Sequence, residues 1–415
     1  MPTTLTYGRN ATCLLEEAET DYLRLQSIDA IPADQIPAVV QSQLADPLAF
    51  PPLAQCTIPG DTVVVAVEPG VPQPAQLVSG VIRALSVAGA EPTKVTVLLA
   101  SNEPRPEAIE SELAAFGDAP SAVCLHNPDD EKEMAFLGVS QAGSALRLNR
   151  LLCDADVVLP VGASNPIESG GDKTTALPHL FPAFSDSETI ARLAVSSADR
   201  FPNFDGASTQ EISDCYTQLG AQLIVRAVPS ATGQVASVIA GEFRAATRAA
   251  NDRHHDLWRC AAAGDAQLVI ATITGEDQQS WDNLARAISA ATAVLEPDGA
   301  IALCTELAEH PGSALQQLAG SDDPMLVERE ISRTPSFDCG PAMVICRALQ
   351  QHTIYLRSNL KASLVESLGI TPIESDQEVE RLAQTHRPCI VLEDAHWLQP
   401  TVAVPGEEPD EDRDE

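Results

Sequence analysis

Residues 165–178 read NPIESGGDKTTALP and follow directly on the apolar run ADVVLPVG at 155–162. A glycine-bearing turn at the end of a strand is the usual beginning of a phosphate-binding loop. A Walker loop, however, places its lysine immediately after the last glycine, whereas Asp172 here separates Gly171 from Lys173. Because an acid inside a phosphate nest repels a triphosphate, we do not expect a P-loop nucleoside triphosphatase.

Two interpretations of this stretch remain. In the first, Gly170 and Gly171 supply positive φ angles to a turn in which Asp172 and Thr174 bond to the local backbone. In the second, Lys173 projects from a strand end into a crevice, as an anion clamp, a proton carrier or a covalent nucleophile. The chain has only four lysines, so one placed in a glycine-bearing turn is notable.

Charge and composition exclude several classes of protein. Asp and Glu number 59 against 25 Lys and Arg, a formal net charge of -34. Such a field repels nucleic acid and anionic membrane surfaces, and aromatic residues, at 4 %, are too few for a base-stacking platform. We therefore expect no nucleic-acid or membrane partner, and a small organic acid or nucleotide-like ligand held by a local cation. The oligomeric state is left open.

The ten cysteines are scattered without a C-x-x-C pair, which favours reduced thiols in a cytoplasmic protein over disulfides or a zinc site. Neither a membrane-spanning apolar run nor a signal-peptide pattern is expected. Cys339, at the start of an apolar helix, is a candidate reactive thiol without a base nearby in sequence. The adjacent His254 and His255 are expected to form a surface pair, because neighbouring side chains on a helix diverge.

Short β-branched runs alternate with amphipathic ones, which predicts an α/β fold of two α/β domains. Strands are expected at 61–68, 94–100, 121–126 and 155–162, with helices at 75–90 and 104–117 between them and a hairpin within 136–152. Residues 185–260 are expected to be mainly helical, and a second α/β pattern starts at 266. The expected domains are 1–262 and 266–405, followed by a solvated acidic tail at 406–415.

Several segments occur in an order that resembles the nickel-dependent lactate racemase family over residues 5–400. They include DTVVVAVEPGVPQPAQLVSGVIRAL, KVTVLLASNEPRPEAIESEL, the run ending in SGGDKTTALPHLFP, and AQLVIATITGEDQQSWDNLARAI. The resemblance implies a two-domain α/β protein with a cleft for a nickel-pincer nucleotide. In the family the cofactor is tethered to a lysine in a G-G-[RK]-K loop, histidines shuttle protons, and a hydride passes between lactate and cofactor. Lys173 in GGDK matches the tether.

Other positions depart from the family pattern. The stretch VEPGVPQP (67–74) lacks the arginine that clamps the substrate carboxylate, which leaves Glu68 as the nearest candidate. In SNEPRP (101–106) Pro104 replaces a proton-carrying histidine, while Arg105 is kept. His179, just after the lysine, is the histidine best placed along the sequence to reach the same cleft.

Two further histidines of the family pattern are also absent. Ile167 replaces one before the lysine loop, and Leu193 or Ala194 stands where the family has its nickel ligand. Since these side chains neither carry protons nor bind nickel, we do not expect the family's nickel mechanism. In the second domain, the resemblance points to Gly275, Trp281 and Arg286 as cofactor-facing, alongside Gly170, Gly171, Lys173 and Thr174 of the loop.

These observations predict a lactate-racemase-like protein with a divergent site, an isomerase (a racemase or epimerase of a 2-hydroxy acid) if it is active. The catalytic candidates are Lys173, Arg105, Glu68 and His179. The alternative is a catalytically inactive protein of the same fold that binds a small molecule or a partner.

Overall fold

The computed structural model describes residues 3–15, 20–23, 29–100, 105–164, 180–199, 206–230, 233–319, 323–333, 336 and 338–402. Contacts divide the chain into two units. The N-terminal unit comprises Ser27–Leu257 and Ser332–Gly340, and the C-terminal unit comprises Met1–Gln26, Trp258–Ile331 and Pro341–Glu415. The first 26 residues thus group with the second half of the chain, which a linear division at 262–266 does not anticipate. That these units are independent folding domains stays a prediction.

The N-terminal unit contains a six-stranded sheet in the order β11-β10-β9-β4-β5-β6, parallel except for the β10–β11 pair. Its strands are β4 (Val63–Val67), β5 (Val95–Leu99), β6 (Ala122–Leu125), β9 (Val157–Ala163), β10 (Leu223–Pro229) and β11 (Val235–Glu242). The four strands expected between residues 61 and 162 are confirmed. The region 185–260 is less helical than expected, because β10 and β11 lie inside it.

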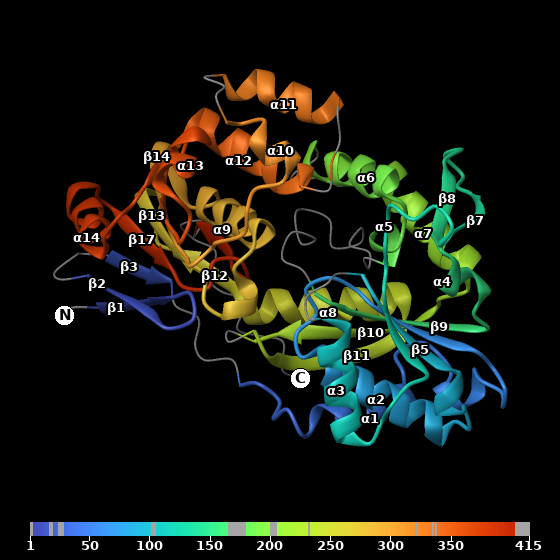
Figure 1. Ribbon diagram of the computed structural model, residues 1–415. Helices are drawn as coiled ribbons and strands as arrows, with labels where there is room; N and C mark the ends of the chain where they lie inside the picture. The colour runs from blue at the N-terminus through green and yellow to red at the C-terminus, as the bar shows by residue number, and fades with distance from the viewer. Residues whose placement is uncertain are drawn as a thin grey trace. The chain divides into compact units, whose positions relative to one another are not determined.

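Helices cover both faces of this sheet (Figure 1). Every residue of β4 is buried, as is usual for a parallel strand with helices on both sides. Val63, Val65 and Val67 pack in one core cluster, whereas Val64 and Ala66 pack in the other. The helices of this unit are α1 (Ile36–Ala45), α2 (Pro74–Val87), α3 (Pro106–Phe116), α4 (Arg150–Asp154), α5 (Leu180–Ala183), α6 (Ser187–Asp199), α7 (Gly206–Leu219) and α8 (Phe243–Trp258). The expected hairpin is β7 (Met134–Val139) with β8 (Ala145–Asn149).

The C-terminal unit contains a second six-stranded sheet, wholly parallel, in the order β16-β15-β14-β13-β17-β3. Its strands are β3 (Thr20–Leu23), β13 (Ala266–Thr272), β14 (Leu295–Cys304), β15 (Thr353–Arg357), β16 (Thr371–Pro372) and β17 (Cys389–Leu392). Its helices are α9 (Trp281–Thr292), α10 (Ser313–Gln316), α11 (Pro324–Arg333), α12 (Cys339–Gln351, which begins in the other unit), α13 (Ala362–Ser367) and α14 (Asp376–Thr385). A short parallel pair, β12 (Arg259–Ala262) and β18 (Gln399–Val402), lies apart from the sheet.

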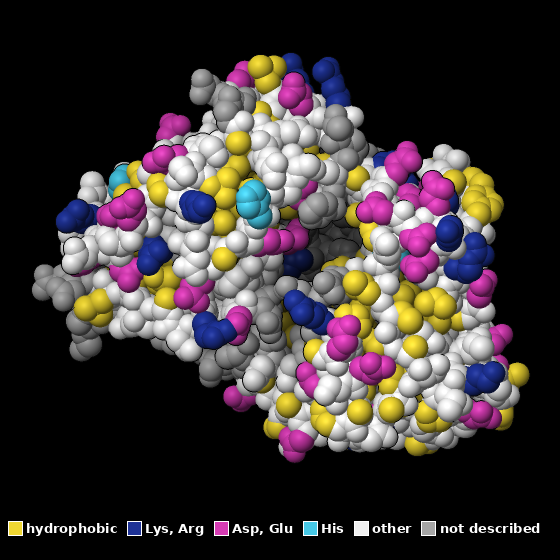
Figure 2. Space-filling view, in the orientation of Figure 1, with side chains coloured by type: hydrophobic (Ala, Val, Ile, Leu, Met, Phe, Trp, Pro, Cys, Tyr) yellow, Lys and Arg dark blue, Asp and Glu magenta, His cyan; other side chains and the backbone are white. Residues whose placement is uncertain are grey.

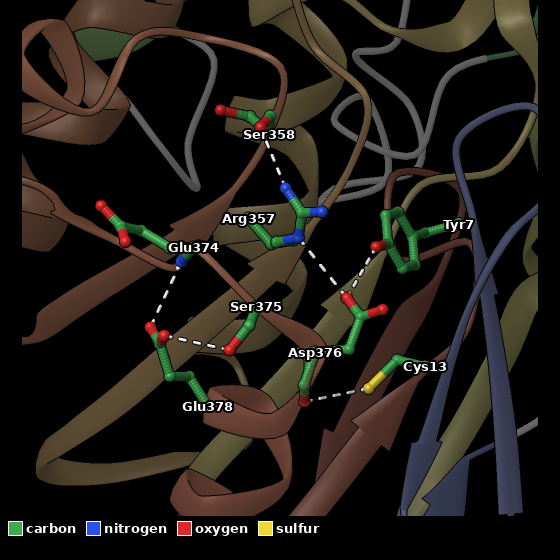
Figure 3. A network of polar contacts seen from close by, with 8 residues as sticks. All are labelled: Tyr7, Cys13, Arg357, Ser358, Glu374, Ser375, Asp376 and Glu378. Atoms are coloured by element: carbon green, nitrogen blue, oxygen red, sulfur yellow. Dashed lines mark hydrogen bonds and ion pairs between the residues drawn. The ribbon is translucent and has the colours of Figure 1, made fainter.

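The N-terminal hairpin β1 (Thr3–Tyr7) and β2 (Ala11–Leu15) belongs to the C-terminal unit and packs against α14. The Tyr7 hydroxyl donates to Asp376 Oδ1 at 2.9 Å, and Arg357 Nε donates to the same oxygen at 3.4 Å (Figure 3). The Cys13 thiol donates to the backbone carbonyl of Asp376. Burial raises the pKa of this thiol to about 12, so the network is a structural clamp rather than a reactive site.

Each sheet reverses its strand order at one place. In the N-terminal sheet β4, β5 and β6 run one way, and β9 returns to the other side of β4. In the C-terminal sheet β13, β14, β15 and β16 run one way, and β17 returns to the other side of β13. Ligands of open α/β sheets bind beyond the carboxyl ends of the strands at such switch points. The residues that follow β4, β9, β13 and β17 are therefore the ones to inspect.

Candidate functional site

The switch point of the N-terminal sheet lies where the sequence analysis places the lysine loop. Glu68 follows β4 and its N–H donates to Val161 O at 2.9 Å, while Ser164 follows β9 and its N–H donates to Ala227 O at 2.8 Å. Residues 165–179 continue directly from Ser164. Lys173, His179, Gly170, Gly171 and Thr174 belong to that segment and lie outside the described residues. Their predicted roles stay predictions, but the point from which their segment leaves the sheet is fixed.

Glu68 forms a fully buried ion pair. Arg226 Nη1 on β10 donates to Glu68 Oε2 at 2.6 Å, and the two side chains are 0 % and 1 % exposed. Tyr216 OH donates to Glu68 Oε1 at 3.4 Å, and burial followed by the neighbouring carboxylate raises the pKa of this phenol well above its usual range. The carboxylate is thus engaged in a core network at the base of the site.

Arg226 is a residue that the sequence analysis missed. The signal was present, because an arginine inside the apolar run LIVRAVP (223–229) must find a buried partner once the strand is covered on both faces. What the sequence could not supply was the identity of that partner, 158 residues away.

Arg105 lies at the same edge of the sheet by connectivity, after β5 and immediately before α3. Its side chain is exposed, and its carbonyl accepts from the N–H groups of Ala108 and Ile109 at the start of the helix. Pro104 and the three residues before it lie outside the described residues. Arg105 therefore presents a cation to solvent near the strand end, and its role in a site stays a prediction.

His254 is not on the surface, so the expectation of a surface histidine pair is wrong. Its side chain is 0 % exposed, and its Nδ1 lies 3.0 Å from Ser164 Oγ. On α8 the residues Phe243, Ala246, Ala250, His254 and Trp258 form one buried stripe at helical spacing. His255 points elsewhere and is half-buried, as the divergence of neighbouring helical side chains requires. A titratable group thus adjoins the residue from which the lysine segment leaves β9.

The C-terminal residues that the resemblance pointed to are close to the second switch point. Gly275, at φ 90, donates its N–H to Gly8 O at 2.9 Å. Trp281 is buried and its indole N–H donates to Glu309 O at 3.1 Å, so it is held in place by the backbone. Arg286 is half-buried on α9, where its Nη1 donates to Asn283 Oδ1 at 3.3 Å. Whether these residues face a cofactor stays a prediction.

Asp394 and His396 follow β17 at the same switch point, and the sequence analysis missed both. Asp394 Oδ1 accepts from the N–H of Thr274 at 3.0 Å and from its hydroxyl. Burial raises the pKa of the Asp394 carboxyl to about 6. His396 is 1 % exposed, and burial, followed by the positive charge of Arg286, lowers the pKa of its imidazole to about 3. The available signal was the cluster of ionisable residues in EDAH (393–396) after an apolar strand.

Three further features of the described residues concern surface charge, cysteines and membrane spans. On the face shown in Figure 2, Asp and Glu side chains are spread among uncharged ones rather than gathered into one patch. All ten cysteines are free thiols, and Cys339 is buried with its sulfur accepting from the N–H of Ser336. Within the described part of the chain, no helix has the length and apolar character needed to cross a bilayer.

Comparisons with known proteins agree with the resemblance seen in the sequence. Residues 7–191 match the model of the lactate racemase N-terminal domain. The chain is similar to the lactate racemase apoprotein from Thermoanaerobacterium thermosaccharolyticum, at 17 % identity and a TM-score of 0.74, covering 96 % of this chain and 100 % of that one. It is also similar to a structural-genomics protein from Thermotoga maritima, at 12 % identity and a TM-score of 0.65, covering 91 % and 100 %. No curated protein matches.

The fold and the domain match define a lactate-racemase-like α/β protein. Residues 7–191 are thus similar to the lactate racemase N-terminal domain, and the fold is similar to that of a lactate racemase.

The described residues do not fit the nickel ligand that the resemblance implies. Leu193, one of the two residues that the resemblance places where the family has its metal-binding histidine, is 3 % exposed and packs in an apolar core cluster. A hydrocarbon side chain has no donor atom for nickel, and the side chain of Ala194 lies outside the described part. Among the side chains that the structure describes, no group of three His, Cys, Asp or Glu is placed to hold a metal ion. We therefore derive no chemistry through nickel.

Proposed function

We propose that this protein is an isomerase of the 2-hydroxy-acid racemase or epimerase type, with its site at the switch point between β4 and β9. One observation carries the proposal. The segment with Lys173 leaves the sheet at Ser164, beside the strand end that bears Glu68, which is where an open α/β sheet places its ligand. We place the protein in the cytoplasm, which its free thiols suit.

The residues have different tasks in this proposal. Lys173 and Arg105 supply the local positive charge that a carboxylate substrate requires in a chain of net charge -34. Inversion at the hydroxyl-bearing carbon also needs groups that remove and return a hydrogen, and Lys173 and His179 are the proton carriers that this segment offers. Glu68, engaged with Arg226, fixes the strand end rather than touching the substrate.

The test is the interconversion of enantiomers of small 2-hydroxy acids, followed by chiral chromatography. Replacing Lys173→Ala should lower the rate at least about 100-fold, because removing a group that transfers protons usually costs that much. Lys132→Ala, a lysine in the turn before β7, is the matched control and should leave the rate unchanged. Equal rates for the Lys173→Ala variant and the natural protein would refute this site.

The cofactor is tested separately, on protein produced together with enzymes that make the pincer nucleotide. Intact-mass analysis reports a mass increment on Lys173, and metal analysis reports nickel. The core position of Leu193 leads us to expect an unmodified chain without nickel. A stoichiometric adduct with nickel would show that the chain uses another metal ligand.

A second function, ligand binding without turnover, is favoured by two observations. Leu193, one of the two candidates for the position of the family's metal ligand, is buried in the core, and Glu68 forms a buried ion pair with Arg226. Thermal-shift measurements with 2-hydroxy acids and nucleotides separate the two functions, since any ligand that binds the folded state raises the melting temperature. Stabilisation without turnover would support binding alone.

A further inference from the structure

Tyr216, on α7, is fully buried in the N-terminal unit, and its hydroxyl makes two hydrogen bonds. It accepts from the backbone N–H of Leu180 at 3.2 Å and donates to Glu68 Oε1 at 3.4 Å. A phenol has one O–H to donate and lone pairs to accept, so it can serve both partners at once. The ring stacks on Phe243, with centroids 5.0 Å apart and an angle of 13° between the planes. Tyr216 thus joins the backbone of one segment to the carboxylate of another.

Two described residues border the lysine segment, and a buried helical side chain contacts each of them. Ser164 comes directly before residues 165–179, and its Oγ lies 3.0 Å from His254 Nδ1 on α8. Leu180 comes directly after them, begins α5 and bonds to Tyr216 on α7. The two contacts differ, because the side chain that holds Leu180 also contacts Glu68. The return of the chain after the lysine segment is therefore tied to the end of β4.

The hydrogen bond of Leu180 is not a local one. An N–H group at the start of a helix is most often satisfied by a side chain immediately before that helix. Leu180 instead bonds to a tyrosine 36 residues away in the sequence. The other partner of this tyrosine is the buried carboxylate of Glu68, which Arg226 Nη1 contacts at 2.6 Å. The backbone at Leu180 is thus located relative to the strand end of the proposed site.

We propose that Tyr216 is a positioning residue for the reaction at the switch point between β4 and β9. It does not touch the substrate but acts through Leu180, whose neighbour in the chain is His179, the proton carrier proposed above. This inference rests on the proposed function, because it gives Tyr216 a task in that reaction. A reacting group misplaced by about 1 Å can lower a rate about 100-fold. Loss of the hydroxyl should therefore slow turnover and leave the cations that attract the substrate unchanged.

The first experiment measures hydrogen exchange of the Leu180 amide, which needs no activity. Tyr216→Phe removes the hydroxyl and keeps the ring that stacks on Phe243. Its matched control is Tyr7→Phe, because Tyr7 is also buried and donates to a carboxylate, that of Asp376, but belongs to the C-terminal unit. We expect exchange at least about fivefold faster in Tyr216→Phe, the factor that one lost hydrogen bond typically gives, and no change in Tyr7→Phe. Unchanged exchange in Tyr216→Phe would overturn the proposal.

The second experiment measures kcat and KM for the interconversion of 2-hydroxy-acid enantiomers. In Tyr216→Phe we expect kcat at least about tenfold lower, with KM changed less than about twofold, because the lost bond lies next to His179 and Arg105 is kept. A purely structural role would lower the melting temperature and leave kcat per folded molecule unchanged, as expected for Tyr7→Phe. That result in Tyr216→Phe would overturn the proposal.

Failure of the proposed function is recognised separately, because it needs no variant. A natural protein that interconverts no 2-hydroxy acid would refute the isomerase. The exchange measurement would then still decide whether Tyr216 holds Leu180. An active natural protein whose Tyr216→Phe variant keeps both the exchange rate and kcat would refute the task of Tyr216 alone.

Discussion

Individual ionisable residues at the second switch point have pKa values moved in opposite senses by the same burial. The pKa of the Asp394 carboxyl is raised to about 6, and the pKa of the His396 imidazole is lowered to about 3, because burial removes hydration from the charged form of each group. Between pH 4 and pH 6 the folded state holds a proton on Asp394 that the unfolded state has lost. Over the same range, the His396 imidazole is neutral in the folded state but protonated in the unfolded state. Their effects on stability therefore oppose each other.

The Asp394 contribution can be isolated by Asp394→Asn, which keeps an acceptor oxygen for Thr274. Since the folded-state pKa lies about two units above 3.8, the natural protein should lose stability relative to the variant as pH rises from 4 to 6.5. The loss is up to about 3 kcal/mol, at 1.36 kcal/mol per pKa unit. Urea denaturation at several pH values measures it, with the exposed Asp34→Asn as control. A difference that does not change with pH would contradict the assignment.

At the scale of elements, the neighbouring strands β4, β9 and β10 position the buried ion pair between Glu68 and Arg226. Glu68 comes from the end of β4 and Arg226 from the middle of β10, and Gly162 of the intervening β9 leaves the space between them. A side chain at Gly162 would overlap both Glu68 Oε2 and Arg226 Nη1. The glycine is thus required by the close approach of the ion pair.

Gly162→Ala should therefore destabilise the N-terminal unit by about 3–5 kcal/mol, the usual cost of disrupting a buried ion pair. Gly264→Ala is the matched control, because no atom lies within 4 Å of the added methyl group and the glycine does not have a positive φ. Equilibrium denaturation compares the two variants. Similar small effects in both would show that the ion pair accommodates the methyl group.

At the scale of the whole molecule, segments from both halves of the chain build the C-terminal unit. β3 pairs with β17 at the edge of the second sheet, and the β1–β2 hairpin contributes Leu5, Cys13 and Leu15 to the core of the C-terminal unit. The two core clusters of the N-terminal unit contain none of these residues. The first 26 residues are therefore structural parts of the C-terminal unit.

A chain that begins at residue 27 should lose stability in the C-terminal unit by several kcal/mol, since each buried Leu contributes about 1.5–3 kcal/mol. Hydrogen exchange should become faster in β17, which loses its β3 neighbour, and remain slow in β4. A chain ending at residue 405 is the control, because the acidic tail is expected to be solvated. Unchanged exchange in β17 would contradict the role of the N-terminal residues.

The alternation of β-branched and amphipathic runs predicted β4, α2, β5, α3, β6 and β9 correctly, because period and length are local properties. Local pattern also held the evidence for Arg226 and for the buried stripe that includes His254. It did not name their partners, which lie 158 and 90 residues away. The prediction for 185–260 failed in part because two short strands lie between long helices.

The sequence by itself determined the α/β class, the acidic composition, and the place of the lysine segment after β9, since these depend on composition and on neighbours along the chain. Only the tertiary structure decided that β9 pairs with β4, that β17 pairs with β13, and that β3 pairs with β17. Sheet order depends on how whole faces are buried, and this brings Glu68 to Arg226, Ser164 to His254 and Asp394 to Thr274.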